Sequence, residues 1–206
     1  MEKSKIWPTI HAERKALAAD LEGLTDAQWA TQSLCHEWTV RDVLAHMTAT
    51  AQKTPFNFVP GMIASGFSLT KLQSKDIARV EASGDLLGDF KKVVDRSTAP
   101  PGPVDTWLGE VLLHSADIRS PLHIGHDYPV DAAVRVADSY KKTNLVMGAK
   151  NRIAGLKLTA TDADWSHGSG PEVSGSMMSL LMAMSGRKAA LADLSGDGVA
   201  TLSSRE

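Results

Sequence analysis

Apolar residues recur at intervals of three and four through much of the chain, which is the spacing of one face of an α-helix. The predicted helices span residues 8–24, 40–53, 86–94, 106–125 and 131–147. Two helix starts carry capping signals, because 25–28 (TDAQ) has the form of a capping box and Thr39 precedes Asp42 by three residues. Pro55 and the proline cluster of 99–103 end helices.

The pattern changes after about residue 148. Residues 155–162 alternate apolar and polar positions and predict a strand, and further strands are expected at 172–174 and 198–204. A helix interrupted at Gly186 lies between the last two of these strands, whereas 55–70 fits either a loop or a bent helix. We therefore predict a mainly α protein, with a four-helix bundle over 1–147 and a small α+β domain over 148–206.

Composition and charge place the chain among ordinary globular proteins. The 206 residues are 43% hydrophobic and 22% charged, with a formal net charge of −2, which predicts no attraction to nucleic acid or anionic lipid. Cys35 is the single cysteine, so an intramolecular disulfide is excluded and a reducing cytoplasm is expected. The first fifteen residues lack the apolar segment of a signal peptide, and the apolar run 177–184 is too short to span a membrane.

Three polar residues interrupt the apolar helix predicted over 106–125. Glu110, His114 and Asp117 follow one another at intervals of four and three, so they share one edge of the helix. His46, beside the apolar stripe of another predicted helix, would add a second imidazole. Two histidines and one carboxylate leave one coordination position open, as in catalytic zinc sites, and Asp117 could orient His114.

The same residues also have an ordinary structural interpretation. A Glu/His pair four residues apart is commonly a hydrogen bond on a helix surface, worth about 0.2–0.5 kcal/mol. A single histidine near an apolar stripe, such as His46, is more often a packed residue than a ligand. Spacing alone leaves both interpretations open.

Three segments resemble the mycothiol-dependent maleylpyruvate isomerase family, a branch of the DinB/YfiT-like metal-binding bundles. Residues 33–47 (SLCHEWTVRDVLAHM) resemble its N-terminal signature, with a Cys, a Trp and then TVRDVxAH. Residues 109–125 (GEVLLHSADIRSPLHIG) resemble its second signature. Residues 168–187 (GSGPEVSGSMMSLLMAMSGR) resemble its C-terminal turn, helix and Gly-Arg pair.

This resemblance implies roles for particular residues. His46, Glu110 and His114 match the family's metal ligands, which usually bind zinc, and Asp117 matches the acid beside them. Arg187 falls where the family places an arginine that faces the active site, and a guanidinium there would clamp an anionic substrate. A surface position just after a helix is an equally good interpretation of Arg187.

The chain also departs from the family pattern. His36-Glu37 replaces the usual Pro-Gly, and His123, His126 and His167 are further imidazoles near the motifs. They either line the site or face solvent. We interpret Cys35 as a packed residue and Arg119 as a structural or gating residue.

Four functions follow in order of preference. The first is a cytoplasmic enzyme in which a divalent metal and mycothiol isomerise or conjugate a small, possibly anionic electrophile. The second is a metal- or thiol-binding stress protein without catalysis. The third is a metal-dependent hydrolase with Asp117 as its base, and the last is a structural bundle without metal.

Overall fold

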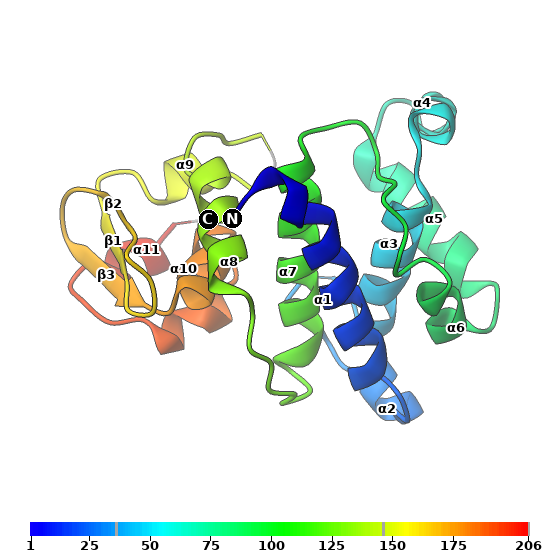
Figure 1. Ribbon diagram of the computed structural model, residues 1–206, viewed down its shortest axis with the longest axis horizontal. Coiled ribbons are helices and arrows are strands. Elements are labelled where there is room, and N and C mark those ends of the chain that lie inside the picture. The colour runs from blue at the N-terminus through cyan, green and yellow to red at the C-terminus, as the bar shows by residue number, and fades with distance from the viewer. Residues whose placement is uncertain (36, 146, 206) are drawn as a thin grey trace. The chain divides into compact units, whose positions relative to one another are not determined.

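The computed structural model describes residues 1–35, 37–145 and 147–205, which form two compact units (Figure 1). One unit spans Glu2–His126, and the other spans Asp127–Glu206 together with Met1. The first unit contains a short 3-10 helix (Lys3–Lys5), α1 (Ile6–Asp20), α2 (Asp26–Trp29), α3 (Val40–Gln52), α4 (Pro55–Ala64), α5 (Leu69–Glu81), α6 (Leu86–Lys91) and α7 (Val104–Arg119).

The first unit is a helical bundle centred on α7. This helix packs against α1 and α3, and α3 in turn contacts α5 and α6 (Figure 1). Every residue from Leu108 to Arg119 is buried, including the polar ones. The core is formed by fully buried side chains of α1, α3, α6 and α7, among them Ile10, Leu17, Leu44, Met47, Phe90, Leu108 and Leu112.

The predicted capping boxes start two of these helices. Thr39 N–H donates to Asp42 Oδ2 at 2.8 Å, and Asp42 N–H donates to Thr39 Oγ1 at 3.2 Å. Thr25 and Gln28 make the equivalent reciprocal pair at the start of α2. These caps satisfy amide groups that have no partner within the first helical turn.

Helix α7 ends at Arg119, earlier than the predicted end near residue 125. His123 adopts a left-handed conformation with φ of 55°, and Ile124 N–H donates back to Arg119 O at 3.0 Å. A left-handed residue just after a helix reverses the chain and cannot continue the helix. His123 is therefore part of the turn that stops α7.

The second unit combines helices with a small sheet. It contains α8 (Val130–Tyr140), α9 (Ala149–Arg152), β1 (Lys157–Ala160), β2 (Ser166–Gly168), β3 (Glu172–Gly175), α10 (Met177–Met184), a 3-10 helix (Lys188–Asp193) and α11 (Val199–Ser203). The strand order is β2-β1-β3, with β1 antiparallel to β2 and parallel to β3. Leu158 of β1 pairs in register with Val173 of β3, and both are fully buried.

The mainly α fold with a small C-terminal sheet is confirmed, but two local predictions differ from the structure. The strand predicted at 198–204 is wrong, because these residues include α11. Ser195 already bridges Ser174 of β3, and Gly198 N–H donates to Glu172 O at 2.8 Å. Since this chain segment fills the edge of β3, the residues that follow have no free sheet edge to extend.

The helix predicted over 131–147 is also shorter in the structure, because α8 ends at Tyr140. Its apolar face packs against α10, and the boundary between the two compact units lies between residues 126 and 127. The division into domains at residue 147 stays a prediction. No helix among the described residues is long and apolar enough to cross a membrane.

Candidate metal centre

The buried edge of α7 carries the predicted carboxylate and imidazole groups. Glu110, His114 and Asp117 lie at intervals of four and three residues, and all three are buried. The interior of a protein normally excludes ionisable side chains unless they are paired or bind a metal. Their burial on the central helix therefore requires partners for each of them.

Asp117 supplies a partner for His114. Asp117 Oδ2 lies 2.9 Å from His114 Nδ1, and both side chains are shielded from solvent. An ionised carboxylate can only accept a hydrogen bond, so Nδ1 carries the proton. In a neutral imidazole this leaves the lone pair on Nε2, the usual arrangement for a histidine that binds a metal.

His46 reaches the same place from α3. Its ring centroid lies 5.0 Å from that of His114, with the rings nearly perpendicular at 80°. The Trp38 ring lies beside His46, with 4.9 Å between the ring centroids and an angle of 40° between the ring planes. Burial, and secondarily the neighbouring His114, lowers the pKa of His46 to about 3. His46 is therefore a neutral imidazole at physiological pH, which is the form that binds a metal.

Glu110 is the least satisfied group of the centre. Both of its carboxylate oxygens are buried without a hydrogen-bond partner among the described residues. Burial raises its pKa, while His114 and Arg14 act in the opposite direction. A buried carboxylate without a hydrogen bond is costly, and coordination to a cation would remove that cost.

Arg14 of α1 is the basic residue that counters Glu110. Its side chain is fully buried, and burial lowers its pKa while Glu110 raises it. Nη1 donates to Arg96 O at 3.0 Å, but Nε and Nη2 have no hydrogen-bond partner among the described residues. Sequence analysis missed this residue, although an arginine on the apolar stripe of Ile10 and Leu17 is a visible signal.

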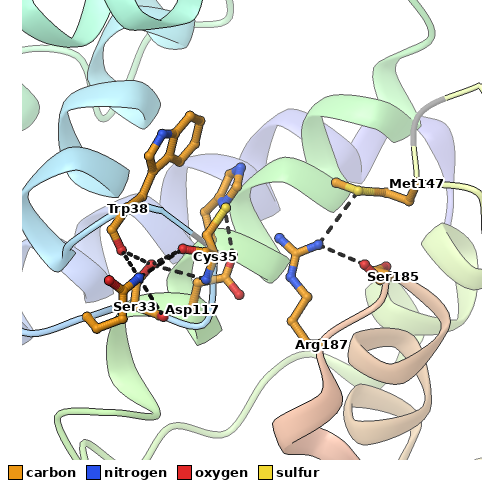
Figure 2. Close-up of polar contacts among 9 residues, drawn as sticks. Ser33, Cys35, Trp38, Asp117, Met147, Ser185 and Arg187 are labelled. Atoms are coloured by element: carbon orange, nitrogen blue, oxygen red, sulfur yellow. Dashed lines mark hydrogen bonds and ion pairs between the residues drawn. The ribbon is translucent and has the colours of Figure 1, made fainter. Parts of the chain in front are cut away.

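The loop before α3 brings Cys35 to the same helix (Figure 2). Ser33 Oγ donates to Trp38 O at 2.7 Å, Trp38 N–H donates to Cys35 O, and Leu34 N–H donates to Asp117 O. Cys35, His114 and Asp117 each offer a ligand atom within 4.8 Å of the others, the one such group found among the described residues. This second donor set shares His114 with the predicted trio.

Arg187 belongs to the second unit and is buried there. Its Nη1 donates to Ser185 O at 3.0 Å and lies 3.6 Å from Met147 Sδ (Figure 2). Arg187 lowers the pKa of nearby Arg152, in addition to the larger effect of burial. The surface position considered from the sequence is thus wrong, whereas a role of Arg187 toward the metal centre stays a prediction.

The remaining candidate residues have other contacts. Arg119 forms a partly buried ion pair, with Nη2 2.6 Å from Asp20 Oδ2, so it connects α7 to α1. His126 Nε2 lies 2.8 Å from Glu13 Oε2. His167 is on β2, and burial lowers its pKa. His36 lies outside the described residues.

The chemistry of the predicted trio suits a divalent metal, although the one group of donor atoms that the described residues bring within 4.8 Å of one another is that of Cys35, His114 and Asp117. A bound cation would provide a partner for the buried oxygens of Glu110, which have no hydrogen bond among the described residues. His46 is neutral, and the hydrogen bond from Nδ1 of His114 to Asp117 leaves Nε2 of His114 available to a metal. Two imidazoles and one carboxylate suit zinc and several other divalent metals. His46, Glu110 and His114 as the ligands stay a prediction, in competition with the donor set that contains Cys35.

Comparisons with known proteins agree with the resemblance in the sequence. Residues 10–57 match the family model "Mycothiol maleylpyruvate isomerase N-terminal domain". The crystal structure of the mycothiol-dependent maleylpyruvate isomerase is similar, with a TM-score of 0.62 and 16% identity, covering 96% of this chain and 93% of that one. A variant of that enzyme with one histidine replaced by alanine gives a TM-score of 0.61 at the same identity and coverage. No curated protein sequence matches the chain.

Proposed function

Since residues 10–57 match the mycothiol maleylpyruvate isomerase N-terminal domain and the whole chain shares the fold of that isomerase, we propose a thiol-dependent enzyme. The protein isomerises or conjugates a small electrophile, with mycothiol as its thiol cosubstrate and a divalent metal, most suitably zinc, at the centre on α7. The reaction takes place in the cytoplasm, as the single cysteine suggests.

The buried carboxylate of Glu110 carries this proposal. It lies one helical turn before His114, and its two oxygens have no hydrogen-bond donor among the described residues. A purely structural bundle would gain stability by replacing this carboxylate with an apolar side chain. A metal ligand, by contrast, needs its lone pairs free.

His46, Glu110 and His114 would hold the metal. When bound, such a metal lowers the pKa of a thiol in the open position and so supplies a nucleophile at neutral pH. Asp117 fixes the His114 tautomer, Trp38 lies beside His46, and Arg14 keeps positive charge near Glu110. Arg187 is proposed, from the family resemblance, to bind an anionic group of the substrate.

The chemistry of the electrophile follows from the thiol. Addition of a thiolate to a double bond conjugated with a carbonyl group forms a carbon–sulfur bond and moves the π electrons onto the carbonyl oxygen as an enolate, so the former double bond becomes a single bond about which the substrate rotates. Collapse of the enolate then restores the double bond and expels the thiolate unchanged, which is an isomerisation. If the enolate carbon instead takes up the proton that the thiol released, the adduct leaves as the product, and the reaction is an S-transfer.

One observation weighs against the hydrolase alternative. Asp117 would have to serve as its general base, but this carboxylate is fully buried and is hydrogen-bonded to His114. A base needs access to the water that it deprotonates. A non-catalytic metal- or thiol-binding protein would keep the same centre, so turnover is what separates it from the enzyme.

The test starts with metal content. Protein purified without an affinity tag or added metal is analysed by mass spectrometry, alongside His46→Ala, His114→Ala and the control His167→Ala. We expect near-stoichiometric zinc in the wild type and control, and its loss in the other two variants. Absence of metal, together with failure to take up added zinc, would overturn the metal centre.

Turnover is then measured with mycothiol and conjugated cis-dicarboxylic electrophiles. Thiol-dependent isomerisation or adduct formation that disappears with the metal supports the enzyme. Bound zinc and bound mycothiol without turnover of any electrophile would support the non-catalytic alternative.

A further inference from the structure

Exposed apolar side chains are concentrated on one short segment of the first unit. Six large apolar side chains are exposed in the described parts of the chain, and five of them lie between residues 56 and 69. These five are Phe56, Val59, Ile63, Phe67 and Leu69. Exposed apolar residues are normally scattered singly over a protein surface, so a concentration of them in one segment indicates an interaction surface.

Helix α4 (Pro55–Ala64) presents the first three of these side chains. Phe56, Val59 and Ile63 are spaced by three and four residues and therefore share one helical face. None of the ten residues of α4 is buried, although the helix carries no charged residue. Its main helical neighbour among the described residues is α5, and Phe56, Val59 and Ile63 each stay more than half exposed.

Phe67 adds a further exposed apolar side chain three residues beyond the end of α4. It holds a left-handed backbone conformation, with φ of 59°, and its N–H donates to Met62 O at 2.8 Å. A bulky residue rarely adopts this conformation because its Cβ is crowded. The residue is nevertheless 75% exposed, so packing within the unit does not explain why an aromatic residue is held there.

The charge of this segment is one-sided. Residues 53–75 contain Lys53, Lys71 and Lys75 and no acidic residue, whereas the rest of the chain carries nineteen basic and all 24 acidic residues. Lys53 is paired with Asp76 at 2.7 Å, and Lys75 Nζ donates to Ala64 O at the end of α4. Lys71 is exposed and has no ion pair among the described residues.

We propose that α4 and the turn at Phe67 dock onto an anionic lipid surface. Phenylalanine and isoleucine side chains would enter the boundary between headgroups and acyl chains, while Lys71 and Lys75 contact anionic headgroups. The net charge of −2, which predicts no such attraction, conceals this local excess of positive charge. Docking is peripheral and reversible, because ten helical residues are too few to span a bilayer.

A second copy of this chain fits the same face less well. A two-fold contact through α4 would bring Lys71 and Lys75 of both copies toward one another, while the adjacent acidic residue, Asp76, is already paired with Lys53. Like charges across an interface oppose association. An anionic lipid surface instead attracts Lys71 and Lys75.

The experiment measures binding of the full-length protein to vesicles of phosphatidylcholine and phosphatidylglycerol in equal parts, by co-sedimentation. Vesicles of phosphatidylcholine alone serve as the reference. Phe56→Ser with Phe67→Ser removes the two aromatic anchors, and Lys71→Glu reverses one charge. Leu145→Ser, at a leucine that is 91% exposed like Phe56, and Lys188→Glu are matched controls in the second unit.

We expect binding to the anionic vesicles that weakens as salt is raised. The double serine variant should bind about tenfold more weakly or worse, and Lys71→Glu about fivefold or more, whereas both controls bind like the wild type. Circular dichroism and thermal unfolding verify that each variant is folded.

Two results would overturn the proposal. One is no binding to anionic vesicles, or binding that the variants leave unchanged. The other is a concentration-dependent dimer, detected by light scattering, that the double serine variant abolishes while no vesicles are bound. That second result would assign the face to another copy of the chain. Neither result bears on the metal centre, whose test is separate.

Discussion

Asp117 and His114 form a hydrogen-bonded pair inside a helix that is buried over most of its length, with 2.9 Å between Oδ2 and Nδ1. The three-residue spacing alone brings the two side chains to the same edge of α7. Burial then strengthens the interaction, because no water competes for the carboxylate. The pair fixes both the orientation of the imidazole and the nitrogen that is available to a metal.

Asp117→Asn tests what this pair does. The amide oxygen can still accept from Nδ1, but the negative charge that raises the basicity of the imidazole is lost. We expect zinc affinity to fall about 10- to 100-fold, measured by competition with a chromophoric chelator. Asp131→Asn, at an exposed position in the first turn of α8, should leave the affinity unchanged. Equal affinities for Asp117→Asn and the wild type would contradict the role of Asp117.

Arg14→Met tests the charge that faces Glu110. Because Arg14 opposes the effect of burial on the pKa of Glu110, its removal raises that pKa further. Zinc must then compete with a proton at Glu110 up to a higher pH, so we expect weaker binding with a steeper dependence on pH. Affinity is measured at several pH values between 5.5 and 8.5, with Arg14→Lys as the conservative variant. If Arg14→Lys also fails to show the wild-type pH profile, a packing role for Arg14 is the better explanation.

Glu110→Gln separates stability from metal binding. The pKa of Glu110 is raised in the folded state, so its ionisation lowers stability as the pH rises above the unfolded-state value. The neutral amide avoids this cost, and we expect the metal-free variant to melt at or above the wild-type temperature at pH 7. The gain should be about 2–4 °C for each kcal/mol recovered.

Calorimetry with and without zinc completes this test. Zinc should raise the melting temperature of the wild type and leave that of Glu110→Gln unchanged, since a ligand stabilises only the state that binds it. Both proteins are first stripped with a chelator. A variant that zinc stabilises as strongly as the wild type would remove Glu110 from the ligand set.

Local patterns in the sequence predicted the start of α3 and the polar edge of α7 well. Thr39 and Asp42 encode their cap within four residues, and the spacing of Glu110, His114 and Asp117 needs only a helix. Such features depend on neighbours along the chain, so a sequence contains them directly. The helical spacing of Glu110, His114 and Asp117 therefore predicts their shared edge without any tertiary contact.

Features that depend on distant partners were predicted less well. The amphipathic pattern of α8 shows that one face is buried, but it does not show that α10 covers it. The role of Arg14 depends on Glu110, which is far away in the sequence. Residues 199–203 form α11 instead of a strand because residues 195–198 already occupy the edge of β3. Residues 55–70 fitted either a loop or a bent helix, and the structure forms α4 there with its apolar side chains exposed.

His46 makes the stability of the metal-free protein depend on pH. Its pKa of about 3 in the folded state lies below the ordinary value of 6.5, so the unfolded chain binds more protons between these values. Unfolding free energy should therefore be fully retained above pH 6.5 and fall as the pH drops toward 3. Urea titrations measure this slope, to which one proton contributes at most about 1.4 kcal/mol per pH unit.

His46→Gln should flatten this acid limb in the metal-free protein. His11→Gln, which removes an imidazole that contacts Trp7 on α1, controls for the loss of one histidine. If the slopes of the wild type and His46→Gln coincide between pH 4 and 6, proton exclusion at His46 is not the cause of the acid sensitivity.

Cys35 decides between the two donor sets that share His114. Cys35, His114 and Asp117 already lie within 4.8 Å of one another, but a metal there would have to replace the hydrogen bond between Asp117 and Nδ1 of His114. It would also leave the buried oxygens of Glu110 without a partner among the described residues. Ligation of a metal by His46, Glu110 and His114 would give Glu110 a partner and keep that hydrogen bond, so we expect Cys35→Ser to retain stoichiometric zinc.

Cobalt substitution provides a direct readout of the same choice. A thiolate bound to Co²⁺ gives an intense charge-transfer band in the near ultraviolet, whereas imidazole and carboxylate ligands do not. We expect this band to be absent from the cobalt protein and to appear when a low-molecular-weight thiol is added, in the wild type and in Cys35→Ser alike. A band present before thiol is added, and lost in Cys35→Ser, would place Cys35 in the position proposed for the cosubstrate. The metal would then have to release Cys35 before any external thiol could bind.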